Sequence, residues 1–195
     1  MRVYLAGPDV FLPAAEARAA VLKSICTRHG LRGVSPLDPL DEEPEGWSGL
    51  PEAQRIALRN EAHISRSAAL IANLTPFRGP SADVGTVFEI GYMRALGRPV
   101  FGWSNSAAPF NERTRAFLGA AAVRGPDGAW LDHEGMLIEA FGLSDNLMID
   151  AAILASGGEL FTAAVEQASR WTDLAAFQRC VAAAARKLLS SPSPP

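Results

Sequence analysis

Two carboxylates, Asp83 and Glu89, are the side chains in this sequence best suited to chemistry. They lie six residues apart in an otherwise apolar, glycine-containing segment, and no Lys or Arg occurs between Arg78 and Arg94. Burying a carboxylate without a partner costs free energy, and a purely structural helix would more often carry Ala or Leu there. Glu89 is therefore a nucleophile, an acid/base group or a helix-surface residue that faces solvent.

Glycines on either side of Glu89 favour a functional role. Gly85 and Gly91 fall inside a predicted helix, where each costs roughly 1 kcal/mol relative to Ala, so they indicate close approach of a ligand or a neighbouring backbone. Asp83 could cap the helix that starts at Val84 and could also hydrogen-bond a ligand. Two carboxylates that flank one glycosidic bond are the usual equipment for glycosyl transfer.

The other candidates have structural interpretations as well. Tyr4 is a core residue or one that orients a buried carboxylate, and Phe11 is a core residue or a surface on which an aromatic ligand stacks. The histidines and cysteines show no metal-ligand spacing, and no dinucleotide, triphosphate-binding or Gly-x-Ser-x-Gly motif occurs. We expect neither a metal nor a cofactor.

Bulk properties narrow the class of protein. A chain of 195 residues fits one domain, and a net charge of -3 does not suggest binding to polymeric nucleic acid. Cys26 and Cys180 have no C-x-x-C spacing, which suits a reducing cytosol. The sequence enters a strand-like run at once, and no apolar run reaches the roughly 18 residues needed to span a membrane. We expect a cytoplasmic protein without a signal peptide or a membrane segment.

Apolar runs and their stops predict alternating strands and helices. The predicted strands are residues 3–6, 31–34, 68–74 and 99–103. The predicted helices are residues 13–29, 51–67, 84–96, 145–155 (capped by Ser144 or Asp145) and two within 159–189, broken near residues 171–173. Residues 35–51 form a long loop that could act as a lid, residues 104–133 are rich in loops, and residues 190–195 form a disordered tail.

This alternation predicts an α/β fold: a single-domain, doubly wound (Rossmann- or flavodoxin-like) parallel sheet with helices on both faces and a helical C-terminal extension. We assign residues 1–155 to the α/β domain and residues 156–189 to the extension packed on it. Ligands of such sheets bind outside the carboxyl ends of the strands. Three informative segments fall at such ends: residues 7–11, residues 75–83 and the residues from Trp103 onward.

Four segments together resemble the nucleoside 2-deoxyribosyltransferases. They are Tyr4-Leu-Ala-Gly-Pro8, the Asn73–Asp83 loop, the Asp83–Tyr92 helix start and Ser144-Asp-Asn146. The resemblance is ordered along roughly the first 150 residues and is most specific between Asp83 and Glu89.

The resemblance implies a role for each matched catalytic position. Glu89 would attack C1′ of a 2′-deoxyribonucleoside, Asp83 would contact the base and shuttle its proton, and Tyr4 would hold Glu89. Asn146 would reach the sugar's 5′ end from a neighbouring subunit, so the protein would be a homo-oligomer of at least two subunits with shared active sites.

Further positions would bind the substrate, a 2′-deoxyribonucleoside or a free nucleobase in nucleotide salvage. They are Gly7, Phe11, Asn60, Phe77 and Gly85. Many members have Asp near position 60. Asn60 can still hydrogen-bond the sugar, but it cannot act as a base. Trp47 would join Phe11 and Phe77 in setting base preference.

Three alternatives remain open. A hydrolase of the same superfamily would act on 2′-deoxynucleosides or deoxynucleoside 5′-monophosphates, although Asp9 would repel a phosphate and only Arg78 and Ser81 are nearby candidates to bind one. A cytokinin-type phosphoribohydrolase would need a Gly-Gly pair that is absent before Gly85. A non-catalytic nucleotide-sensing module could dispense with Glu89.

Overall fold

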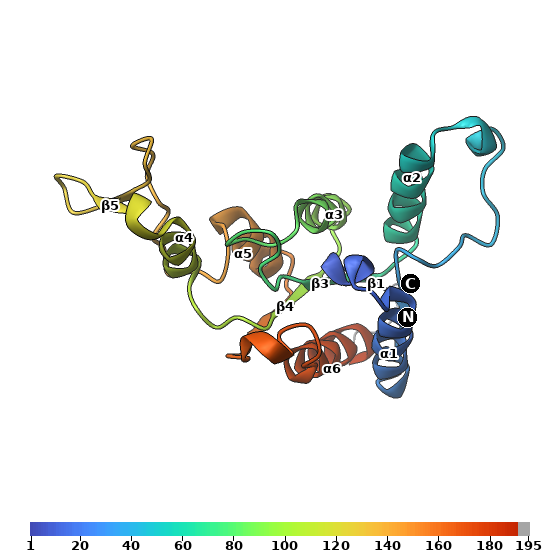
Figure 1. Cartoon of the computed structure of the whole chain (residues 1–195). Helices are drawn as coiled ribbons and strands as arrows, with labels where there is room; N and C mark the ends of the chain where they lie inside the picture. The colour runs from blue at the N-terminus through green and yellow to red at the C-terminus, as the bar shows by residue number, and fades with distance from the viewer. Residues whose placement is uncertain (191–195) are drawn as a thin grey trace.

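Five parallel strands form a central sheet in the order β2-β1-β3-β4-β7 (Figure 1). They span Arg2–Ala6 (β1), Arg32–Val34 (β2), Ala69–Asn73 (β3), Val100–Ser104 (β4) and Leu160–Thr162 (β7). This computed structural model describes residues 1–190. The strand order and the helices on both faces confirm the predicted doubly wound α/β fold, with a C-terminal helix present.

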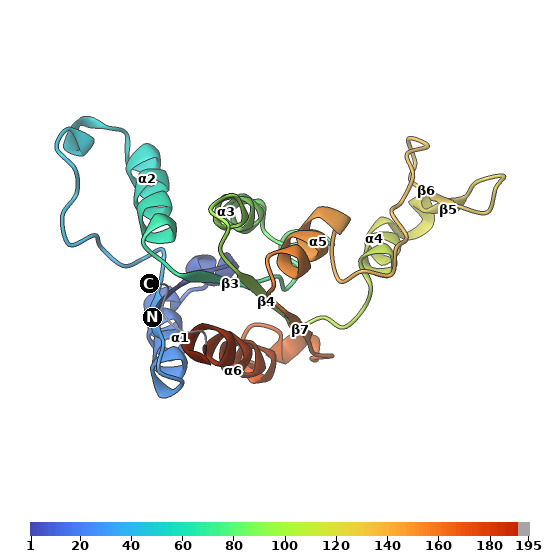
Figure 2. The same ribbon diagram turned by 180° about the vertical axis from the view of Figure 1, so that it is seen from behind.

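Helices cover the sheet on both faces. Helices α1 (Ala15–Arg28) and α6 (Ala175–Ser190) lie on one face. Helices α2 (Glu52–Ser65), α3 (Val84–Ala95) and α5 (Leu147–Ala155) lie on the other, as Figures 1 and 2 show from opposite sides. All residues of β3 and β4 are buried, as expected of parallel strands with helices on each side.

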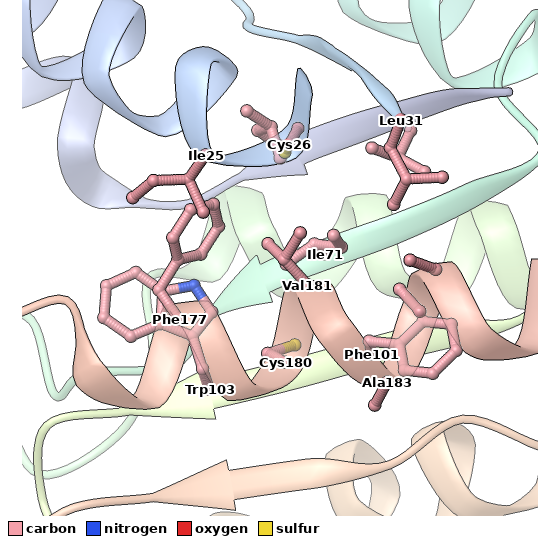
Figure 3. Packing of buried hydrophobic residues seen from close by; sticks show 14 of the residues in the cluster. Ile25, Cys26, Leu31, Ile71, Phe101, Trp103, Phe177, Cys180, Val181 and Ala183 are labelled. Carbon is pink, nitrogen blue, oxygen red and sulfur yellow. The ribbon is translucent and has the colours of Figure 1, made fainter. Parts of the chain in front are cut away.

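The core between α1, α6 and the sheet is dense in large side chains (Figure 3). Trp103 of β4 meets Phe177 of α6 edge-on, with ring centroids 5.5 Å apart. Cys26 and Cys180 are buried in the same cluster as free thiols. The C-terminal helix therefore contributes to the main core.

The C-terminal segment differs from its predicted structure of two helices. Its first part is the edge strand β7, which pairs with Gly102–Ser104 of β4, followed by a 3-10 turn (η4, Gln167–Ser169) before α6. The alanine-rich composition masked a three-residue strand. At Gly158 a Cβ would lie 1.7 Å from the Val100 carbonyl oxygen, so only glycine allows the chain to approach β4 this closely. Ser190 ends α6; the rest of the predicted disordered tail lies outside the described residues.

Residues 105–146 form an arm that extends away from the sheet beyond α5 (Figures 1 and 2). It contains α4 (Phe110–Leu118), a 3-10 turn (η3, Gly119–Ala121) and an antiparallel pair, β5 (Val123–Arg124) and β6 (Trp130–Leu131). The loop of residues 35–51, which includes a 3-10 turn (η2, Trp47–Gly49), projects beside α2 at the opposite end of the molecule. Within residues 1–190, no helix has the length and apolar character needed to cross a membrane.

Candidate active site

The carboxyl ends of β1 and β3 form the point where the chain switches direction across the sheet, which is where ligands of doubly wound folds bind. After β1 the backbone turns at Gly7 into a 3-10 turn (η1, Pro8–Phe11). A Cβ at Gly7 would lie 2.6 Å from the Asn73 Cβ and 2.9 Å from Asp9 Oδ2. Glycine therefore allows the two strand ends to converge.

A cavity of about 410 Å³ opens at this point. Its walls come from η1, the start of the 35–51 loop, α2 and the first turns of α3. It brings together six of the residues singled out from the sequence: Gly7, Phe11, Asn60, Asp83, Gly85 and Glu89. It also includes six that sequence reasoning missed: Val10, Pro36, Leu37, Ile56, Arg59 and Thr86.

Glu89 lies on the second turn of α3 and is 9% exposed, while Tyr4 on β1 is completely buried. The Tyr4 hydroxyl donates a hydrogen bond to Glu89 Oε1 at 2.6 Å. Burial raises the pKa of Glu89, the Tyr4 bond lowers it and the charge of Asp83 raises it, with a net value of about 7. Burial, and then Glu89, raise the pKa of the Tyr4 hydroxyl, so it remains protonated and keeps donating.

Asp83 caps α3, which confirms that part of the sequence analysis. Its Oδ2 accepts from the Thr86 backbone N–H at 3.0 Å and from the Thr86 hydroxyl at 3.1 Å. Oδ1 accepts no hydrogen bond from any of residues 1–190, so one oxygen of this cavity-lining carboxylate is available to a ligand. Asp83 can therefore cap α3 through Oδ2 and bind a ligand through Oδ1.

An aromatic wall bounds the cavity at Phe11, which is 56% exposed. Phe77 stacks on it with centroids 5.3 Å apart and rings 11° from parallel, and Arg78 lies over both rings. Trp171 meets Phe77 edge-on. Phe77 therefore supports Phe11 and does not itself line the cavity.

The family model described as nucleoside 2-deoxyribosyltransferase matches residues 3–148. The chain belongs to the nucleoside 2-deoxyribosyltransferase family. An uncharacterized protein of Schizosaccharomyces pombe is 33% identical over 165 residues, which is 80% of this chain and 78% of that protein. A 2-desoxiribosyltransferase from Leishmania mexicana superimposes with a TM-score of 0.56 at 29% identity, covering 76% of this chain and 84% of that one.

Membership of the nucleoside 2-deoxyribosyltransferase family supports deoxyribosyl transfer or a related N-glycosidase activity, and nucleoside substrates fit it. Asn60, expected to hydrogen-bond the sugar, lines the cavity from α2. Its Oδ1 is shielded from solvent and has no hydrogen-bond partner within residues 1–190.

Asn146, the residue expected to serve a neighbouring subunit of a deoxyribosyltransferase, lies outside the cavity of its own subunit. It is the N-cap of α5: its Oδ1 accepts from the Met148 N–H at 3.0 Å, and its Nδ2 donates to Glu139 at 2.9 Å. The expected cap was Ser144 or Asp145, so that prediction is wrong by one or two residues.

Asp145 instead ties the loop before Asp83 to α5, a role that no sequence signal indicated. It is 1% exposed and accepts hydrogen bonds from the Ser81 hydroxyl, from the Ala82 N–H at 3.0 Å and from Arg113 at 3.2 Å. The Ser81 hydroxyl is therefore engaged within the protein, which removes a candidate phosphate ligand.

The structure corrects the expectation that Asp9 would repel a phosphate. Asp9 pairs with Arg18 at 2.8 Å and accepts from Asn73 at 2.7 Å, so it does not present an unbalanced charge that would repel phosphate. At Gly91 a Cβ would meet nothing within 4 Å apart from its own helix backbone and chain neighbours, so no other backbone of residues 1–190 approaches it; approach of a ligand there stays a prediction. At Gly85 a Cβ would lie 3.1 Å from Asp83 Oδ2, so the tight contact there is with the capping side chain of the same helix and not with a neighbouring backbone.

No group of three or more His, Cys, Asp or Glu side chains that could hold a metal ion occurs within residues 1–190. Trp47, expected to influence base preference, does not line the cavity.

Proposed function

We propose that this protein transfers 2-deoxyribose between nucleobases through a covalent intermediate on Glu89. The observation that carries the proposal is the buried Glu89 carboxyl, held by Tyr4 at 2.6 Å in a cavity that Asp83 also lines. The cavity is formed by residues from separate parts of the chain, and it combines a positioned carboxylate, a second carboxylate and an aromatic wall.

In the first step, Glu89 attacks C1′ of the bound nucleoside. The C1′–N bond breaks, its electron pair goes to the departing base, and the base takes a proton delivered through Asp83. In the second step, a nitrogen of the incoming base attacks C1′, the ester to Glu89 breaks, and that base gives a proton back to Asp83. Two inversions give net retention of configuration.

Burial and the Tyr4 bond suit Glu89 to this role. A pKa of about 7 leaves a large ionised fraction at neutral pH, and the poorly solvated carboxylate is a better nucleophile than one in water. Tyr4 fixes the orientation of the carboxyl group and leaves Oε2 as the attacking oxygen. Tyr4 is thus a positioning residue.

The substrate contacts follow from the cavity walls. Phe11 would lie against the base, with Phe77 behind it, while Asn60 would hydrogen-bond the sugar, and Gly7 and Gly85 would leave room for the ligand.

Asn146 of a neighbouring subunit would complete the site at the sugar's 5′ end. The exposed stripe of Val84 (84% exposed) and Phe88 (60% exposed) on α3, the helix that carries Glu89, supports contact with a second copy.

Incubation with 2′-deoxyinosine, with and without excess adenine, tests the reaction. Formation of 2′-deoxyadenosine is expected, with loss of turnover in Glu89→Gln and a mass increase on Glu89 when the donor is supplied without an acceptor base. Release of hypoxanthine that adenine does not affect would instead identify an N-glycosidase. A Glu89→Gln variant with full activity would exclude this nucleophile.

A further inference from the structure

Arg59 of α2 lines the cavity that holds Asp83 and Glu89, and it is the one basic side chain among the described cavity-lining residues. The Arg59 guanidinium is paired with a carboxylate of the same chain. Glu43 Oε1, from the 35–51 loop, accepts a hydrogen bond from Arg59 Nη2 at 2.6 Å, and the other oxygen of Glu43 accepts from Arg55 Nη2 at 2.9 Å.

Arg55 and Arg59 lie one helical turn apart, so both reach the same point in space. Two guanidiniums that hold two oxygens of one anion form the kind of site that binds carboxylates and phosphates with directional, charge-assisted hydrogen bonds. The two arginines lower the pKa of Glu43, which therefore stays ionised at neutral pH. An anion site at the cavity is thus filled by a residue of the same chain.

Glu43 also holds the outer part of the 35–51 loop against α2. The start of the loop is anchored through Asp38, which pairs with Lys23 at 2.6 Å, and Pro36 and Leu37 beside it line the cavity. Beyond that anchor, Glu43 supplies the ion pairs that hold the loop against α2. A ligand anion that took the place of Glu43 at Arg59 Nη2 would also release the outer part of the loop from α2.

We propose that Glu43 is an internal occupant of an anion site formed by Arg55 and Arg59, and that it makes the active site select neutral nucleosides over nucleoside phosphate monoesters. With Glu43 in place, the cavity presents the carboxylates of Asp83 and Glu89 and an arginine that is already ion-paired with a carboxylate of the same chain. This inference rests on the proposed function, because it concerns the substrate of the same cavity.

Replacement of Glu43 by Gln tests the proposal, with Glu42→Gln as the matched control. Glu42 is an exposed neighbour in the same loop that forms no ion pair within residues 1–190, and its replacement changes net charge equally. The measurement is the ratio of calorimetric affinities for 2′-deoxyadenosine 5′-monophosphate and 2′-deoxyadenosine at low ionic strength, where exposed charges are least screened.

Glu43→Gln is expected to shift this ratio toward the monophosphate by roughly tenfold or more, the usual effect of one charge-assisted hydrogen bond. Glu42→Gln should leave it unchanged. Adding Arg59→Gln to Glu43→Gln should remove the gain. An unchanged ratio in Glu43→Gln, an equal gain in Glu42→Gln, or a gain that survives Arg59→Gln would each overturn the proposal.

These readouts separate the inference from the proposed function. Monophosphate binding that increases in Glu43→Gln and depends on Arg59, in a protein without base exchange, would support the anion site and reject the transferase. Base exchange combined with an unmoved affinity ratio would support the transferase and reject the role of Glu43.

Discussion

Burial and hydrogen bonding shift the pKa of the Glu89 carboxyl group in opposite directions. Burial alone would hold the residue protonated and unreactive, while the bond from Tyr4 stabilises the ionised form. The resulting pKa of about 7 places the proposed nucleophile at the boundary between its two forms at neutral pH. Because the reactive form is the carboxylate, activity should rise as pH increases through this value.

Tyr4→Phe should move that rising limb of the pH–rate profile to higher pH. The change removes a hydrogen bond to the charged form of Glu89, so its pKa rises, and a bond of this kind corresponds to about one pH unit or more. We expect activity at pH 7 to fall by roughly tenfold and to recover substantially at pH 9. A loss that is the same at every pH would mean that Tyr4 acts only through packing.

Asp83 combines a structural and a proposed chemical role, which two substitutions can separate. Asn caps helices about as well as Asp, so Asp83→Asn should keep the melting temperature while kcat falls about a hundredfold or more. Asp83→Ala should show the same kinetic loss and also lower the free energy of unfolding by about 1 kcal/mol. Full activity in Asp83→Asn would show that the carboxylate has no role beyond the cap.

At the scale of elements, α3 divides its residues between two faces. Thr86, Glu89, Ile90 and Met93 recur at helical spacing and are buried, so the turn that carries Glu89 is fixed by the apolar contacts that follow it. On the other face of the sheet, α6 packs against the same strands and holds them in place. Helix α6, which lies outside residues 3–148 matched by the family model, therefore supports the site through the strands of the sheet.

Phe177→Ala measures that support. Phe177 is 1% exposed and contacts Trp103 on β4, so the cavity left by its removal should cost about 3–5 kcal/mol in the free energy of unfolding, measured by denaturant titration. Leu189→Ala, on the same helix but 52% exposed, is the control and should cost less than about 1 kcal/mol. Similar small losses for both would mean that α6 is dispensable to the core.

At the scale of the whole molecule, the cavity and Asn146 are separate within one subunit. The apolar stripe of Val84 and Phe88 runs along α3, next to α5, whose first turn Asn146 caps. We propose that two copies pair symmetrically through this side of the molecule and that each Asn146 reaches the partner's site.

Subunit mixing tests that arrangement. Glu89→Gln and Asn146→Ala should each be inactive alone. After denaturation and refolding together, mixed dimers should contain one intact site, built from Glu89 of one subunit and Asn146 of the other. Random pairing should restore about a quarter of the wild-type activity. No recovery, with mixed dimers demonstrated by mass spectrometry, would show that Asn146 does not act across the interface.

The sequence by itself determined the layers of the fold and the chemical character of the site. Apolar runs that alternate with amphipathic segments dictate a parallel sheet covered on both faces, and the spacing of Asp83 and Glu89 places one at a helix start and the other on its second turn. These features depend on neighbouring residues, so local patterns predict them. The three-residue strand β7 escaped prediction because its residues pair only with a distant strand, β4.

Only the tertiary structure decided which side chains meet. Tyr4 and Glu89 are 85 residues apart, and their contact depends on the register of β1 beside β3 and on the rotation of α3 against the sheet. The balance of Asp9 by Arg18, the hold of Asp145 on the Asp83 loop and the pairing of Glu43 with Arg59 likewise join separate elements. Such contacts arise from packing in three dimensions, and hydrophobic periodicity, which reports only which face of an element is buried, does not specify them.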